Sequence, residues 1–140
     1  MNIAVRYYTI SGNTKKLADA VAASVNVTAE DISVDLSEKA DILFLGSSLY
    51  GGGYEPSIEK FIEENVDKIG VIVNFGSSVS GKSTFYKIKA LAEEKGITVF
   101  DEFFNCPGRF LLIHRKRPND TDLRAVSSFA KAACAKLSGK

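Results

Sequence analysis

The chain begins with a short apolar run at residues 3–8, and the six residues that follow contain three hydroxyl groups, one amide and one glycine. These six residues are Thr9-Ile10-Ser11-Gly12-Asn13-Thr14. The run from Ile3 to Tyr8 is rich in residues that favour strands. Apolar residues between Leu17 and Val25 then recur at helical spacing. This stretch therefore predicts a strand, a tight polar loop and a helix.

The same alternation continues along the chain. Further strands are expected at 41–46, 71–73 and 97–104, with one short strand within 27–36 and a vestigial helix at 37–40. Residues 110–113 resume a strand pattern after Cys106-Pro107-Gly108. Helices are expected after Pro56, after Gly81 and from Asp120 or Thr121. Strands separated by single helices indicate βαβ units, and hence a parallel sheet with helices on both faces.

Composition limits the function classes. The chain has 140 residues, of which 45% are hydrophobic and 25% charged, and we expect one domain spanning 1–140. Its net charge of +1 gives no electrostatic case for nucleic acid or a membrane surface. No apolar run approaches the roughly 20 residues of a membrane span. Residues 1–5 do not resemble a signal peptide, so we expect a cytoplasmic protein.

Metal and thiol chemistry find little support in the sequence. Cys106 and Cys134 are far apart and match no metal-binding spacing, and His114 is the single histidine. We therefore expect no metal site and no histidine-based catalytic site. Cys106 is expected to be a partly buried structural thiol, with a reactive thiol as the alternative.

The loop at residues 9–14 is the strongest candidate for a ligand site. In an open parallel sheet, ligands bind beyond the carboxyl ends of the strands, where the loops 47–53 and 74–81 are also expected. Helix N-termini favour anions, hydroxyl groups supply donors, and Gly12 permits a close approach of the backbone. The loop therefore predicts a phosphate site that needs no cationic side chain. The alternative is a capped helix after a tight turn.

These six residues also match the pattern [Thr/Ser]-x-[Thr/Ser]-Gly-x-Thr, and the chain resembles the short flavodoxins over essentially its whole length. The stretches 45–52 and 75–77 resemble the two flavin-ring loops of that family. The resemblance implies a three-layer, doubly wound α/β fold with five parallel strands in the order 2-1-3-4-5. It also implies non-covalent binding of flavin mononucleotide (FMN).

The resemblance assigns roles to particular residues. The phosphate would be bound by Thr9, Ser11, Asn13 and Thr14, with the amides of Ile10 and Gly12. One side of the isoalloxazine ring would lie against Ser47, Ser48, Leu49, Tyr50, Gly51 and Gly52, and the other against Asn74, Phe75, Gly76, Ser77 and Ser78. Tyr50 is the candidate for stacking on the ring; the alternative is an aromatic side chain that covers a loop. Gly51 or Gly52 would present a carbonyl to the flavin nitrogen that gains a proton on reduction.

The implied function is electron transfer between redox protein partners, in which the cofactor carries the chemistry and no residue is catalytic. A small FMN-dependent reductase is the alternative within the flavin class. We expect a monomer, with a dimer as the alternative. The chain departs from the family in its near-neutral charge and in having no tryptophan.

A second motif favours a different class of ligand. Residues 76–83 match the P-loop pattern GxxxxGK[ST] and follow an apolar strand. In that interpretation Lys82 contacts terminal phosphates and Ser83 binds magnesium. Small-residue loops reach this pattern easily by chance, and no later strand ends in a suitable Asp, so we rank nucleoside-triphosphate binding second.

Two further interpretations remain at this point. The first is a domain of the same fold that has lost its cofactor. The second concerns the basic run from His114 to Arg117, which is either a solvated loop or a docking patch for an acidic redox partner.

Overall fold

The computed structural model describes residues 1–9, 12–49, 56–78, 84–107 and 117–139. Strands and helices alternate along most of these segments, as the sequence predicts. In chain order the elements are β1 (Ile3–Tyr7), α1 (Asn13–Ser24), β2 (Ala29–Asp31), β3 (Ala40–Leu49), α2 (Pro56–Glu64), the 3-10 turn η1 (Val66–Lys68), β4 (Ile69–Ser78), α3 (Phe85–Glu94), β5 (Thr98–Val99), β6 (Phe104–Pro107) and α4 (Asp120–Ser138).

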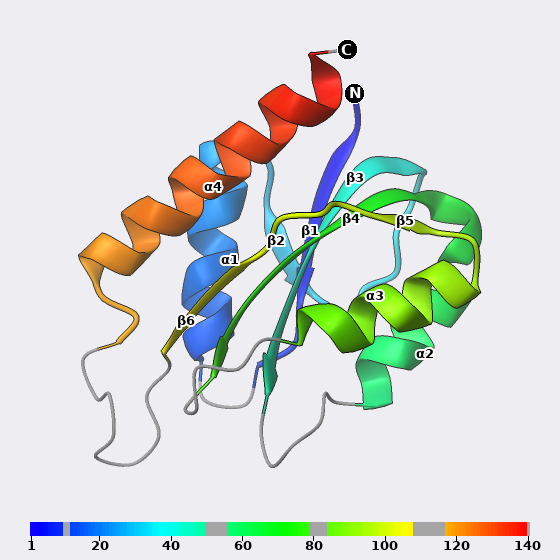
Figure 1. The fold of residues 1–140 in the computed structure, drawn as a ribbon, viewed down its shortest axis with the longest axis horizontal. Helices are drawn as coiled ribbons and strands as arrows, with labels where there is room; N and C mark the ends of the chain where they lie inside the picture. The colour runs from blue at the N-terminus through cyan, green and yellow to red at the C-terminus, as the bar shows by residue number, and fades with distance from the viewer. Residues whose placement is uncertain (10–11, 50–55, 79–83, 108–116, 140) are drawn as a thin grey trace.

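The strands form one parallel sheet in the order β2-β1-β3-β4-β5, with β6 also paired to β4. This confirms the predicted order 2-1-3-4-5. Helices α1 and α4 lie together on one face, and α2 and α3 cover the other (Figure 1). The three-layer, doubly wound fold is therefore confirmed.

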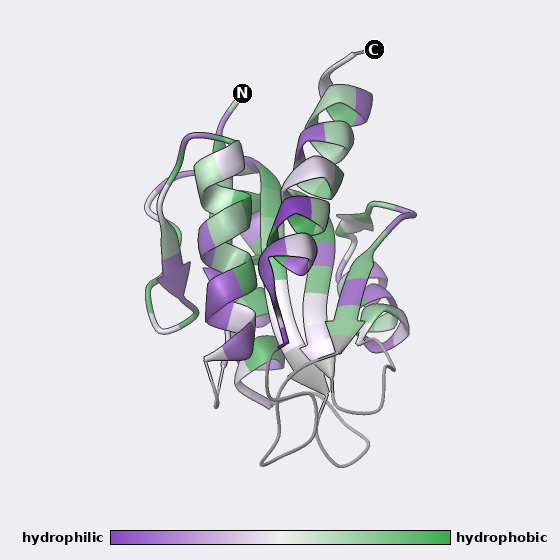
Figure 2. Ribbon diagram, turned by 90° about the vertical axis from the view of Figure 1, so that its left-hand side faces the viewer, coloured by the Kyte–Doolittle hydropathy of each residue, from purple (hydrophilic) through white to green (hydrophobic). Residues whose placement is uncertain are grey.

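Strand residues alternate between two apolar cores. Leu43 and Leu45 of β3 pack on the side of α2 and α3, whereas Ile42 and Phe44 pack on the side of α1 and α4. A strand covered on both faces has to be apolar at successive positions, which explains the continuous apolar run from Ile42. In Figure 2 the central strands change from green to nearly white toward the end of the sheet where the grey loops lie.

The fifth strand position differs from the prediction. Val99 of β5 pairs with Ile72, and Phe104 of β6 pairs with Phe75. More residues separate Val99 from Phe104 than separate Ile72 from Phe75, so the pairing with β4 is interrupted between β5 and β6. The aromatic ring of Phe103 leaves the strand line to stack on Phe85, with ring centroids 4.5 Å apart. The prediction of one continuous strand over 97–104 was therefore wrong for the residues between β5 and β6, where Phe103 packs on Phe85. The predicted strand at 110–113 lies outside the described residues.

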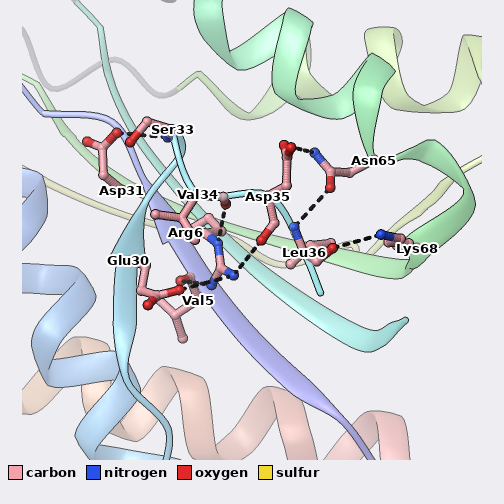
Figure 3. A network of polar contacts seen from close by, with 10 residues as sticks. All are labelled: Val5, Arg6, Glu30, Asp31, Ser33, Val34, Asp35, Leu36, Asn65 and Lys68. Carbon is pink, nitrogen blue, oxygen red and sulfur yellow. Dashed lines mark hydrogen bonds and ion pairs between the residues drawn. The ribbon is translucent and has the colours of Figure 1, made fainter. Parts of the chain in front are cut away.

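The vestigial helix predicted at 37–40 is absent, and hydrogen bonds to side chains hold the β2–β3 connection instead (Figure 3). Arg6 of β1 donates from Nε to the Val34 carbonyl at 2.8 Å and pairs with Glu30 at 3.3 Å. Burial lowers the pKa of the Arg6 guanidinium, and the charges of Glu30 and Asp35 oppose that shift. The side chain of Asn65 accepts the Leu36 amide at 3.0 Å. These side chains pair backbone groups of the β2–β3 connection that regular secondary structure leaves unpaired.

The N-terminus and the end of α4 lie at the amino end of the sheet, opposite the edge where β3 and β4 end (Figures 1 and 2). Within the described ranges, no helix has the length and apolar character needed to cross a membrane.

Candidate functional site

Helix α1 begins at the carboxyl edge of the sheet with Gly12 as its N-cap. Gly12 has a φ of 91°, which side chains rarely tolerate, and no side chain caps the helix. The Thr9 hydroxyl accepts the Gly12 N–H at 2.9 Å, which fixes the turn before the helix. The first helical turn contains no acidic residue, and Lys15 and Lys16 are exposed there. The positive end of the helix dipole is therefore not neutralised by a local carboxylate.

The next two residues link this helix to the centre of the sheet. Asn13 and Thr14 are 3% and 0% exposed, although both are polar. The Thr14 hydroxyl lies 3.3 Å from the hydroxyl of Ser77 in β4. The structure thus brings together two predicted site residues from segments more than sixty positions apart.

Strands β3 and β4 extend further than the sequence predicts. Residues 47–49 and 74–78 were expected in loops but continue the strands, with Ser47 beside Gly76 and Leu49 beside Ser78. Most of these residues are Ser, Gly or Asn, which give a weak local signal for a strand, and pairing with the neighbouring strand decides the outcome. A Cβ atom on Gly76 would lie 2.2 Å from the Ser47 carbonyl oxygen. Glycine therefore permits the close approach of these two strand ends.

Gly46 serves a similar purpose on the opposite face. A Cβ atom there would lie 2.5 Å from the ring of Phe75 and 3.0 Å from the Thr14 methyl group. Phe75 itself is 0% exposed and belongs to the core beside α1 and α4. Phe75 was predicted to flank the flavin ring, but its side chain packs in this core beneath the carboxyl edge of the sheet.

A third group of polar residues lies on the α2–α3 side. The Ser47 and Thr84 hydroxyl oxygens are 2.7 Å apart, and Asn74 Nδ2 lies 3.5 Å from the Thr84 hydroxyl oxygen. Sequence reasoning identified Ser47 and Asn74 but missed Thr84. An N-cap-type residue directly before a predicted helix was the available signal, since such residues define helix starts.

Several predicted residues cannot be placed in this geometry. Ile10, Ser11, Tyr50, Gly51 and Gly52 lie outside the described residues, so stacking by Tyr50 and the carbonyl of Gly51 or Gly52 stay predictions. Ser48, Leu49 and Ser78 are placed as strand residues.

At the edge of the sheet, β6 contributes Cys106, which is 4% exposed. Burial, with a smaller contribution from the charge of Asp122, raises the pKa of its thiol to about 12. A thiol that stays protonated is a poor nucleophile, which fits the structural role expected for it.

Residues 114–116 of the basic run lie outside the described residues. Arg117 forms an ion pair with Asp122, with Nε 2.5 Å from Oδ2.

The geometry does not favour the triphosphate interpretation. Gly76 and Ser77 form regular pairs with β3 on one side and with β6 on the other. A P-loop needs its backbone amides directed at phosphate groups, whereas here the first part of the motif belongs to the sheet. Lys82 and Ser83 lie outside the described residues. Within the described part of the chain, no group of three or more His, Cys, Asp or Glu residues could hold a metal ion.

Comparisons with known proteins agree with this architecture. An uncharacterised protein of Methanocaldococcus jannaschii is 28% identical over 133 residues, covering 86% of this chain and 89% of that protein. A solved flavodoxin from the domain Archaea superposes with a TM-score of 0.78 at 24% identity, covering 98% of this chain and 99% of the other. Flavodoxin 2 from Bacillus cereus superposes with a TM-score of 0.68 at 21% identity, covering 97% and 99%.

At these identities the two structures show a shared fold. The family is shown by a sequence profile of the flavodoxin domain, which matches residues 4–104 and so covers most of the chain. This chain belongs to the flavodoxin domain family.

Proposed function

We propose that this protein binds FMN non-covalently at the carboxyl edge of its sheet and carries electrons between redox protein partners. The observation that carries the proposal is the start of α1. There, a glycine N-cap with positive φ, the Thr9 hydroxyl and a first turn without carboxylates meet at the switch point of the sheet. That arrangement suits a phosphate dianion.

The residues present fit the rest of the cofactor as well. Gly46 and Gly76 sit where a Cβ atom would collide with neighbouring atoms, so the ends of β3 and β4 lie close together. The carboxyl ends of those two strands lead into the segments expected to flank the ring. The buried oxygen Oδ1 of Asn74 also finds no hydrogen-bond partner among the described residues, and a role in binding is one explanation for such an atom.

In this proposal the chain's residues bind and orient, while the bound flavin supplies reversible electron acceptance. Thr9 and Gly12 shape the turn that receives the phosphate, and Thr14 ties that turn to Ser77 of β4. The phosphate site and the ring site are thereby held in fixed relation.

The test is a titration of purified, flavin-free protein with FMN, riboflavin and ATP with magnesium, followed by flavin fluorescence and thermal unfolding. We expect the fluorescence of FMN to be quenched on binding, and we expect bound FMN to raise the unfolding temperature of the protein. Riboflavin should bind more weakly because it lacks the phosphate. Tight, magnesium-dependent ATP binding without flavin binding would overturn the proposal.

A second measurement separates a carrier from a reductase. The FMN-loaded protein, reduced chemically, should pass electrons to a protein acceptor. It should not sustain turnover of nicotinamide nucleotides with small quinones. Sustained turnover would instead support the reductase alternative.

A further inference from the structure

Three buried polar side chains interrupt the apolar core on the α2–α3 face of the sheet. They are Ser47 of β3, Asn74 of β4 and Thr84 before α3, and they are 1%, 1% and 3% exposed. The Thr84 hydroxyl oxygen lies 2.7 Å from that of Ser47, and Asn74 Nδ2 lies 3.5 Å from both the Thr84 hydroxyl and the Leu45 carbonyl. We call these three residues the buried polar cluster.

Asn74 is an unfavourable residue for its position. It follows the apolar residues Val71, Ile72 and Val73 in a central strand, where asparagine is disfavoured. Within the part of the chain that the structure describes, its Oδ1 atom is buried without a hydrogen-bond partner, and the two contacts of Nδ2 given above are long, at 3.5 Å each. A desolvated acceptor without a donor lowers the stability of the fold, and an apolar side chain of similar size would avoid that loss.

Thr84 is also placed against its local preference. It occupies the N-cap position of α3, where a threonine hydroxyl normally accepts a hydrogen bond from the first helical turn. No such capping bond is present. The hydroxyl contacts Ser47 instead, so the start of α3 is tied to β3 across the end of β4.

Two local departures in one small cluster suggest that something other than stability maintains it. Ser47 lies two residues before the end of β3 at Leu49, and Asn74 lies in the carboxyl half of β4, four residues before its end at Ser78. Thr84 is the first described residue before α3. The buried polar cluster thus links the carboxyl halves of β3 and β4 to the start of α3, on the face opposite the Thr14–Ser77 contact.

We propose that the buried polar cluster positions the flavin-ring side of the site. Its bonds hold the ends of β3 and β4 and the start of α3 at the spacing that the ring requires. This inference rests on the proposed FMN binding. It assigns the cluster to the ring and the Thr9–Thr14 segment to the phosphate, so the two halves of the site can be tested separately.

The first test compares Thr84→Val with Thr84→Ser. The valine variant keeps the shape but removes the hydroxyl, while the serine variant keeps the hydroxyl. We expect Thr84→Val to lower the affinities for FMN and riboflavin by about tenfold each, the loss associated with one hydrogen bond. Thr84→Ser should restore both affinities to within about twofold. Inorganic phosphate should raise the unfolding temperature of the flavin-free protein by the same amount in both variants.

The second test uses Asn74→Leu, measured in two ways. Urea unfolding of the flavin-free variant should give a midpoint equal to or higher than that of the unchanged protein, because the unpaired acceptor is gone. Fluorescence titration should nevertheless show weaker binding of FMN and riboflavin, together with an altered absorption band of the bound flavin. A purely structural residue would lower the unfolding midpoint and leave the absorption band unchanged.

The outcomes separate this inference from the proposed function. If the unchanged protein binds no flavin, FMN binding itself is wrong and the inference is overturned with it. If it binds FMN and the Thr84→Val and Asn74→Leu variants bind FMN and riboflavin equally well, the positioning role alone is wrong. Should Asn74→Leu not fold, the Thr84 pair decides the matter.

Discussion

At the scale of single residues, two glycines with positive φ perform different tasks. Gly12 begins α1 at the carboxyl edge with φ 91°, and Gly96 follows α3 at the other end of the molecule with φ 80°. Among the described residues, a Cβ atom would meet nothing within 4 Å at either position. Substitution by alanine therefore tests backbone conformation alone, without steric collision.

We expect Gly12→Ala and Gly96→Ala to lower the free energy of unfolding of the flavin-free protein by similar amounts, about 1–2 kcal/mol each. Only Gly12→Ala should also weaken FMN, by about tenfold or more, because it disturbs the turn proposed to receive the phosphate. Urea unfolding and fluorescence titration measure the two effects. Equal loss of FMN affinity in both variants would show that the effect is general and not specific to the site.

At the scale of elements, Arg6 of β1 holds the connection between β2 and β3 through hydrogen bonds and an ion pair. Its guanidinium donates to the carbonyls of Val34 and Asp35 and pairs with Glu30. Removing it leaves these part-buried carbonyls without a donor, which costs more than the bonds themselves contribute.

Arg6→Met should therefore lower the free energy of unfolding by about 2 kcal/mol, the loss expected when part-buried carbonyls lose a charged donor. The control is Arg124→Met on the exposed side of α4, for which a change within about 0.5 kcal/mol is expected. Urea unfolding at neutral pH measures both. A loss below about 1 kcal/mol in Arg6→Met would contradict the idea that this network secures the β2–β3 connection.

The start of α4 provides a pH-dependent case. Asp122 accepts hydrogen bonds from Arg117 and from the Asn119 amide, and Arg117 is the largest cause of the lowered pKa of this carboxyl. A lowered folded-state pKa stabilises the protein above the unfolded value near 4, and that stability disappears as pH falls through the folded value.

Asp122→Asn should thus cost about 1–2 kcal/mol at pH 7, and the difference from the unchanged protein should shrink below about pH 4. Asp120→Asn, in the same helical turn but exposed, is the matched control and should change little. Thermal unfolding between pH 3 and pH 7 measures the effect. A difference that stays constant across this range would show that the charge of Asp122 is not responsible.

The same scale shows what the sequence could and could not predict. The β1–loop–α1 unit was predictable because a local apolar pattern and a local turn define it. The strand character of 47–49 and 74–78 was not, since small polar residues become strands only through pairing with their neighbours. The interruption before Phe104 depends on the Phe85–Phe103 stack, and the role of Thr84 depends on Ser47, so both required the folded chain.

At the scale of the whole molecule, Cys106 reports how the fold opens. Its thiol is buried in β6 with a pKa raised to about 12, so alkylation at pH 8 requires the protein to open first. In a Cys134→Ser background, Cys106 is the only thiol left to follow.

We expect alkylation of Cys106 to slow in proportion to free FMN, by about a hundredfold at a hundred times the dissociation constant. The reason is that an opening that exposes β6 should also disrupt the adjacent end of β4, where the cofactor is proposed to bind. Mass spectrometry of the labelled protein measures the rate. Alkylation that is insensitive to FMN would mean that β6 separates from β4 while the cofactor stays bound.

The placement of the chain ends matters for any device built from this protein. The N-terminus and the end of α4 both lie at the amino end of the sheet. The ten-residue strand β3 spans roughly 30 Å toward the opposite edge. A protein anchored to a gold electrode through a peptide after α4 would therefore hold its carboxyl edge away from the metal. If the proposed flavin carries electrons at that edge, current would have to reach the electrode through dissolved redox partners rather than directly through the anchor.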